Sequence, residues 1–314
     1  MTQVWALSTA GGYMYSDQLS TKLRMKVQPL TKYRQFCDAK DGINKGLKTG
    51  DAFHWNIYSD VATQGGPLVE TNTMPQTSFS IGQGTLTVTE YGNSVPWTGK
   101  LDALSLQPVS EIVDKVLKND AKKTFDKAAR DQFDRSALRF VATTATDAGT
   151  LYTNGTATGT NSVGLGTGHV KVIVDTMKER NIPPYTDEDY MCVGRVSTFR
   201  PIKNQLEQLH QYTDRGIQLI FNGEIGRYEN TRFVEQTNIA AVGWTNGKSD
   251  RAHFFGGDTI AEAIVIPEEM RGKIPGDFGR DKGVAWYYLG GFGLVHDKTL
   301  DVGNARVVVW DSQG

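Results

Sequence analysis

The sequence holds few of the residues from which catalytic or metal centres are built. Its 314 residues include two cysteines, Cys37 and Cys192, and five histidines, none within five residues of another. Two cysteines exclude a disulfide framework and fit folding in a reducing compartment. No C-x-x-C, H-E-x-x-H or G-x-S-x-G motif occurs, which excludes the usual local signatures of zinc sites and serine hydrolases. We therefore expect no metal, no cofactor and no enzymatic activity.

Long apolar runs and an excess of one charge are also missing. The N-terminus has no basic start followed by an apolar core, so we expect no signal peptide, and no run of 18 apolar residues predicts a membrane span. Lys and Arg together number 34, against 35 for Asp and Glu. That balance argues against nucleic-acid binding over the whole surface. The hydrophobic share of 39% is enough for a buried core.

Three segments resemble ligand sites only weakly. The segment 243–249 (GWTNGKS) has three residues where a phosphate-binding loop needs four, so we interpret it as an exposed turn. The segment 164–169 (GLGTGH) lacks the preceding strand of a dinucleotide fold and is interpreted as the entry to a helix. The acids at 187–189 lack the spacing of a calcium loop, so a solvated turn is favoured over a cation site. Cys192 lies in an apolar strand, which favours a buried structural thiol over a nucleophile.

The most regular pattern in the chain spans residues 107–136. Apolar residues recur there at gaps of three and four, which predicts one long amphipathic helix with Pro108 in its first turn. Such a helix would be about 40 Å long, more than a small domain needs. Its outward positions carry charge: Glu111, Lys115, Lys118, Lys122 and Lys123.

Residues 51–100 predict a long two-stranded hairpin. The segment AFHWNIYSD alternates apolar and polar residues, the stretch 61–76 is rich in turn-forming residues, and TSFSI and TLTVTEYG return as strands. Because an isolated two-stranded ribbon is marginal in water, we expect it to lie on the long helix or on a neighbouring molecule.

The flanking segments are less regular. The N-terminal 40 residues form an arm with a basic run, which could meet nucleic acid or an acidic neighbour or remain a solvated face. Residues 137–168 are small and polar and predict a loop with local strand character. Helices are predicted at 168–181 and 201–212, and strands at 190–196, 223–238, 284–295 and 305–311. For 252–266 the local pattern fits helix or strand.

The order of these elements and several motifs resemble the major capsid proteins of tailed bacteriophages, which have the Hong Kong 97 fold. The match is nearest to the family of N4-like podophage capsid proteins. The segments that carry it are GDAFHWNIYSD, GGPLVETNTMPQ, TLTVTEYGNSVPWTGKLDALSLQPVSEIVDKVLKNDAKKTFD, RFVEQTN and FFGGD. One departure is at the hairpin tip, where Glu70-Thr71 stands in place of the expected Glu-Gly.

The resemblance implies an α+β fold with named regions. They are an N-arm (1–45), an extended E-loop with flanking strands (46–100), a peripheral domain with a spine helix (101–165), an axial domain (166–222 and 241–290), peripheral-domain strands (223–240) and closing strands (291–314) that return to the peripheral domain.

The resemblance also implies the function and the partners. The chain would assemble with itself as hexamers and pentamers into an icosahedral head shell around double-stranded DNA, without contacting a membrane. The E-loop tip with Pro67, Leu68 and Glu70 would contact the next subunit, and Lys22, Arg24 and Lys26 of the arm could face the genome. The chain has no evident room for a fused scaffolding segment, so we expect a separate scaffolding protein, a portal and possibly a cement protein. We expect no covalent crosslinks. The protein would be assembled in the host cytoplasm and reside in the virion.

Three other functions stay open from the sequence. The chain could form the shell of an encapsulin-like nanocompartment of the same fold, or serve as a tail or decoration component of a virion. It could also be a soluble enzyme whose active-site residues lie far apart in the sequence, which would require a defined pocket with convergent polar groups.

Overall fold

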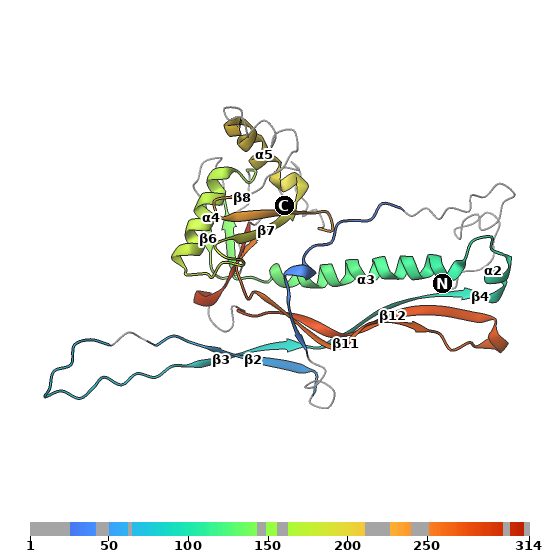
Figure 1. Ribbon diagram of the computed structural model, residues 1–314, viewed down its shortest axis with the longest axis horizontal. Helices are drawn as coiled ribbons and strands as arrows, with labels where there is room; N and C mark the ends of the chain where they lie inside the picture. The colour runs from blue at the N-terminus through green and yellow to red at the C-terminus, as the bar shows by residue number, and fades with distance from the viewer. Residues whose placement is uncertain are drawn as a thin grey trace.

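A computed structural model shows an elongated molecule in which a long helix lies over one sheet and a hairpin projects from one end (Figure 1). The structure describes residues 26–41, 50–61, 65–142, 149–155, 163–210, 227–239, 251–297 and 302–310. Lys22, Arg24 and the segment 243–249 lie outside these ranges.

A four-stranded sheet and one long helix form the first layer pair. The sheet has the order β1-β11-β12-β4, and α3 packs on it. The elements are β1 (Asp38–Asp41), β4 (Thr89–Thr98), β11 (Ile260–Gly272), β12 (Asp281–Leu294) and α3 (Val109–Phe133). The short helix α2 (Gly99–Leu104), capped by the Thr98 side chain, joins β4 to α3. The 25 residues of α3 span about 37 Å, which confirms the predicted helix.

The sequence of α3 explains why it seats on this sheet. Val113, Leu117 and Phe125 are buried at helical spacing. The Phe125 ring lies 5.4 Å from Trp286 and 4.7 Å from Tyr288 of β12, measured between centroids. Pro108 is the N-cap residue that precedes the helix, whereas we predicted it inside the first turn.

A seven-stranded sheet with two helices forms the second part of the molecule, shown above α3 in Figure 1. Its strand order is β6-β5-β13-β10-β7-β9-β8. The elements are β5 (Leu138–Val141), β6 (Thr150–Tyr152), β7 (Tyr190–Arg195), β8 (Arg227–Tyr228), β9 (Thr231–Gln236), β10 (Ala252–Phe255), β13 (Val307–Trp310), α4 (Thr167–Glu179) and α5 (Val196–His210). The apolar faces of α4 and α5 share one buried cluster with this sheet.

The sheet pairing corrects the predicted grouping of segments. Residues 241–290 were expected with 166–222, but β11 and β12 join β4 under α3, and only β10 enters the sheet that carries α4 and α5. Strands β5, β6, β8, β9 and β13 were expected with the long helix and lie in the seven-stranded sheet instead. Strand partners here are far apart in the sequence, so a local pattern does not encode the choice between two sheets.

Two local predictions change as well. Helix α5 begins at Val196 and contains Pro201, so Pro201 does not open it. The segment left open between helix and strand forms β10 and β11. Within the described residues, no helix is long and apolar enough to span a membrane.

Candidate assembly surfaces

The hairpin consists of β2 (Ala52–Tyr58) and β3 (Ile81–Thr87), which pair with each other in a sheet of their own. Figure 1 shows it projecting away from the four-stranded sheet, with residues 65–80 at the far end. This confirms the predicted two-stranded hairpin. The returning segment TSFSI is not a strand, apart from Ile81 at the start of β3.

The root of the hairpin is fixed by close packing against β12. The Leu86 side chain is buried against the backbone of Gly291 and Gly293, where an added Cβ would lie 2.7 Å and 3.1 Å from it. Trp55 donates a hydrogen bond from its Nε1 to the Val295 carbonyl at 3.2 Å. Glycine at these positions lets the two strands approach, which sets the direction of the hairpin.

The tip of the hairpin presents apolar side chains that nothing in the described chain covers. The exposed fractions are 60% for Leu68 and 58% for Val69, and Pro67 and Glu70 beside them are exposed too. Further exposed apolar residues along the hairpin are Tyr58, Met74, Phe79 and Ile81. A solvent-facing row of large apolar residues on one projection is typical of a surface that another molecule covers.

The turn at the tip explains the departure at Thr71. The Asn72 N–H donates to the Val69 carbonyl at 2.9 Å, closing a tight turn. Neither Glu70 nor Thr71 has a positive φ, so this turn does not need the glycine that the resemblance led us to expect.

The charge of the hairpin is one-sided. Residues 50–87 contain the acids Asp51, Asp60 and Glu70 and no lysine or arginine. The hairpin therefore has no amine that could form an isopeptide bond, and it is electrostatically suited to a neutral or basic neighbour.

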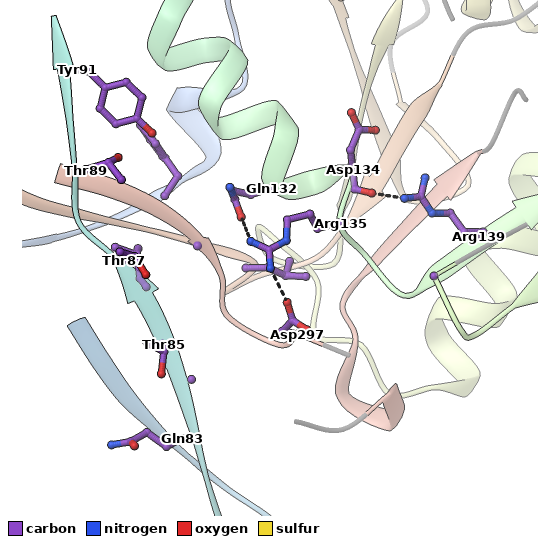
Figure 2. A pocket seen from close by; sticks show the side chains of 16 residues that line it. Gln83, Thr85, Thr87, Thr89, Tyr91, Gln132, Asp134, Arg135, Arg139 and Asp297 are labelled. Carbon is purple, nitrogen blue, oxygen red and sulfur yellow. Dashed lines mark hydrogen bonds and ion pairs between the residues drawn. The ribbon is translucent and has the colours of Figure 1, made fainter. Parts of the chain in front are cut away.

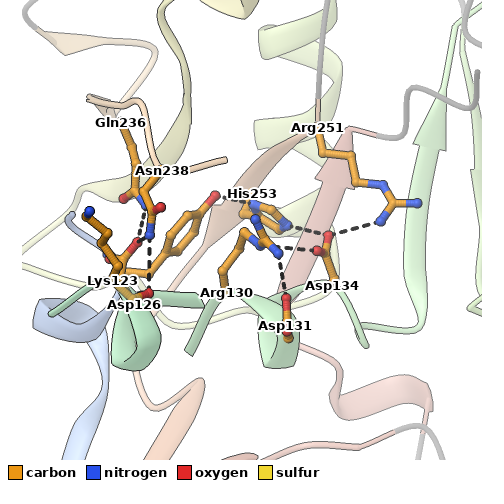
Figure 3. A network of polar contacts seen from close by, with 10 residues as sticks. Lys123, Asp126, Arg130, Asp131, Asp134, Gln236, Asn238, Arg251 and His253 are labelled. Atoms are coloured by element: carbon orange, nitrogen blue, oxygen red, sulfur yellow. Dashed lines mark hydrogen bonds and ion pairs between the residues drawn. The ribbon is translucent and has the colours of Figure 1, made fainter. Parts of the chain in front are cut away.

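Buried polar contacts tie α3 to distant segments (Figure 3). Asp126 accepts hydrogen bonds from the Tyr33 N–H at 2.8 Å, from Asn238 Nδ2 at 2.9 Å and from Gln236 Nε2. Burial raises the pKa of the Asp126 carboxyl, and the hydrogen bonds from Asn238 and Tyr33 act in the opposite direction. No local pattern in the sequence indicates these partners, because they lie 93 to 112 positions from Asp126.

A second buried chain of contacts ends on the last turn of α3. The Tyr33 hydroxyl lies 2.7 Å from His253 Nδ1, and His253 Nε2 lies 3.0 Å from Asp134 Oδ1. Although burial would raise it, the pKa of Asp134 is held well below its usual value by His253, Arg251 and Arg130. An acid that stays ionised at neutral pH orients its neighbours but is not a proton donor.

The N-terminal segment is bound to its own subunit from Leu30 onward, so residues 30–41 do not belong to an arm that reaches a neighbour. Leu30 and Lys32 donate from their N–H groups to Thr237 and Gln236. Arg34 pairs with the buried Glu262 at 2.8 Å and with Glu268 at 3.0 Å, after which β1 joins β11. Lys26, upstream of these contacts, is exposed.

A groove of about 820 Å³ runs beside the root of the hairpin (Figure 2). Its walls are the threonines 85, 87 and 89, the end of α3 and the end of β12. Arg135 forms an ion pair with Asp297 at 3.5 Å and donates a hydrogen bond to Gln132. Its lining holds no histidine or cysteine, and Asp134 is ionised, so the groove does not offer the poised acid and base that the enzyme alternative requires.

The remaining candidate sites have structural roles. Cys192 is buried, as predicted, and burial raises the pKa of its thiol. Asp187 and Glu188 are exposed, but Asp189 is buried and pairs with Arg227 at 2.5 Å and Arg232 at 2.6 Å, so the solvated turn is wrong for that residue. Within 164–169, His169 caps α4 by accepting from the Gly166 N–H. Among the described residues no group of three potential metal ligands occurs.

No protein-family model and no curated protein matches the sequence. Solved structures do match the whole chain. A chain from the capsid of cyanophage P-SCSP1u superposes with a TM-score of 0.68 at 12% identity, covering 96% of this chain and 93% of that one. A chain from the head of Helicobacter pylori bacteriophage KHP40 gives 0.66 at 10% identity, covering 95% of each.

A third match is a chain from the capsid of Ralstonia phage GP4, with a TM-score of 0.64 at 13% identity and 99% of both chains covered. The likeness extends over the hairpin, the long helix and both sheets because nearly all of this chain is covered. The protein therefore has the Hong Kong 97-type fold of phage capsid proteins.

Proposed function

We propose that this chain is the major capsid protein of a tailed bacteriophage. Its copies would close into an icosahedral head shell of hexamers and pentamers that encloses double-stranded DNA. The observation that carries the proposal is the hairpin tip, whose large apolar side chains project beyond the folded subunit and are uncovered in the single chain. Burial of that surface against a second copy would stabilise the assembly by about 25 cal/mol per Å² of apolar area.

The regions take their roles from this assembly. The hairpin is the E-loop, and Pro67, Leu68 and Glu70 at its tip contact the next subunit. The helix α3 is the spine of the peripheral domain, and α4 and α5 belong to the axial domain. Lys22, Arg24 and Lys26 of the N-terminal arm would contact the genome. The role is structural and involves no catalysis, and the family is that of N4-like podophage capsids.

Electron microscopy of the purified protein tests the proposal. We expect closed shells of uniform size when a separate scaffolding protein is co-expressed, and irregular assemblies from the chain alone. A monomer or small oligomer under all assembly conditions would contradict the proposal. A cargo peptide docked inside shells purified without phage would instead identify a nanocompartment.

The covalent state of the shell is a second test. The hairpin, which would reach the next subunit, offers no lysine for a crosslink, and we expect mature particles to run as a single monomer band on a denaturing gel. A ladder of bands above the monomer would contradict this. In the infected cell the protein would assemble in the cytoplasm, together with a portal and possibly a cement protein, and would remain in the virion.

A further inference from the structure

One face of α3 carries four exposed lysines, of which Lys118 alone has an ionic partner in the described part of the chain. Lys115, Lys118, Lys122 and Lys127 are exposed at spacings of three, four and five residues. They wind along the side of the helix opposite the buried residues Val113, Leu117 and Phe125. From Lys115 to Lys127 the strip spans about 18 Å. These four residues are called the lysine strip below.

Four of the five acids of α3 have hydrogen-bond or ionic partners, and Glu111 lies one turn before the strip, so the strip itself has a net positive charge. Asp120 accepts from Asn93 at 2.8 Å and from Trp286 at 3.1 Å, and Asp126 is buried among its donors. Asp114 pairs with Lys118 at 2.7 Å. Within the described part of the chain, the other three strip lysines have no ionic partner.

The strip continues into a shallow groove beside the second half of α3. The groove has a volume of about 510 Å³ and is lined by Lys123, Lys127 and Arg130 together with Pro29, Thr124, Thr237, Asn238 and Ile239. All of its charged lining residues are cations. Figure 3 shows Lys123 next to the Asp126 cluster, on the side of α3 that faces Asn238. Lys26 is exposed three residues upstream of the Pro29 wall.

We propose that the lysine strip and this groove form the surface that contacts the phosphates of duplex DNA, so that α3 faces the inside of the shell. This inference rests on the proposed function. Exposed lysines repeated along a rigid helix suit a partner with regularly repeated negative charge, and phosphates follow each other about every 3.4 Å along one DNA strand. The contact would be independent of base sequence because it involves the backbone alone.

The competing partner would be an acidic protein segment, such as the lysine-free hairpin of a second copy. The strip is less suited to that role because Val116 is its one large exposed apolar neighbour between Lys115 and Lys127 in the described structure. Protein interfaces gain most of their affinity from a buried apolar or aromatic centre, and the tip of the hairpin would find no such centre here.

The test uses the unassembled full chain and a labelled 30-base-pair duplex of arbitrary sequence. Fluorescence anisotropy is measured from about 0.05 to 0.3 M NaCl, a range over which phosphate contacts weaken strongly. The test variant combines Lys115→Gln, Lys122→Gln and Lys127→Gln. The matched control combines Lys100→Gln, Lys171→Gln and Lys178→Gln, which removes equal charge from exposed positions on α2 and α4.

We expect the test variant to reduce the slope of log K against log salt by about three, and to bind at least about tenfold more weakly at 0.1 M, because each lost phosphate contact removes about 0.9 from the slope. The control should keep the wild-type slope. Equal slopes for the two variants, or no salt-dependent binding by the wild-type chain, would overturn the inference.

Shell formation by the same variants separates this inference from the proposed function. We expect the test variant to form shells like the wild type but to package less DNA per particle. Loss of shells with an unchanged DNA slope would overturn the inference and assign the strip to a subunit contact. Failure of the wild-type chain to form shells would count against the proposed function, while the DNA measurement would still decide whether the strip binds phosphate.

Discussion

The helix α3 and the β2–β3 hairpin are both long, but they are held in opposite ways. Side chains of α3 and its C-cap residue Asp134 contact β4, β12, β9, β10 and the N-terminal segment through apolar and polar groups. The hairpin is fixed at its root by Leu86 and Trp55, and in the described structure its tip contacts only itself. The contacts of α3 determine how the subunit folds, whereas the apolar side chains at the hairpin tip are exposed in the described chain and are proposed to contact a neighbouring copy.

The largest effect on folding is expected at Asp126. Replacing Asp126 with Ala leaves the Tyr33 N–H, Gln236 and Asn238 without their buried acceptor. We expect a loss of about 3–5 kcal/mol in the free energy of unfolding, measured by urea denaturation of the unassembled chain. Asp114→Ala, on the exposed side of the same helix, should cost less than about 1 kcal/mol. Equal costs would contradict the role given to the buried cluster.

A smaller loss is expected at the root of the hairpin. A Cβ on Gly291 would lie 2.5 Å from the Thr87 carbonyl and 2.7 Å from Leu86, so Gly291→Val must push β3 away from β12. We expect about 1–3 kcal/mol of destabilisation together with fewer closed shells, because the hairpin changes direction. Gly272→Val is the matched control, since nothing lies within 4 Å of a Cβ there. Normal shells from Gly291→Val would show that the direction of the hairpin is not set at its root.

The acid stability of the subunit should depend on Asp134. The folded protein lowers the pKa of this carboxyl from its usual 3.8, so the unfolded chain takes up a proton where the folded chain does not. The stabilisation that ionised Asp134 gives to the folded state is therefore present above about pH 4, and it is lost as the pH falls toward the folded-state pKa. Asp134→Asn should flatten the decline in unfolding free energy below pH 4, and Glu111→Gln should leave it unchanged. An identical decline in all three proteins would contradict this account.

The local sequence pattern predicted those helices and strands whose secondary structure is determined by residues close by in the sequence. The apolar spacing of 107–136 is enough to place α3, and the alternation around Phe53, Trp55 and Ile57 is enough to place β2. The pattern could not decide β11, because Ile260–Ile266 is buried on both sides and has neither a clear helical nor a clear alternating period.

The errors concern contacts between residues far apart in the sequence. Nothing in the sequence near Asp189 indicates that it pairs with Arg227 and Arg232, so we predicted a solvated turn there. The segment from Leu30 onward was predicted to belong to the arm because its partners, Gln236 and Thr237, lie about 200 positions later in the sequence. The contact of the hairpin tip with the next subunit was implied by the resemblance and stays a prediction; the structure shows that Leu68 and Val69 are exposed.

The smallest effect on folding is expected at the hairpin tip, and there the account is tested most directly. Leu68→Asp is compared with Thr73→Asp, which adds the same charge to an exposed polar position nearby. Thermal unfolding of the unassembled chains and electron microscopy of the assemblies are measured side by side. We predict that Leu68→Asp changes the unfolding free energy by less than about 0.5 kcal/mol and abolishes closed shells, while Thr73→Asp still forms them. Closed shells of normal size from Leu68→Asp would contradict the claim that the hairpin tip is completed by a second copy.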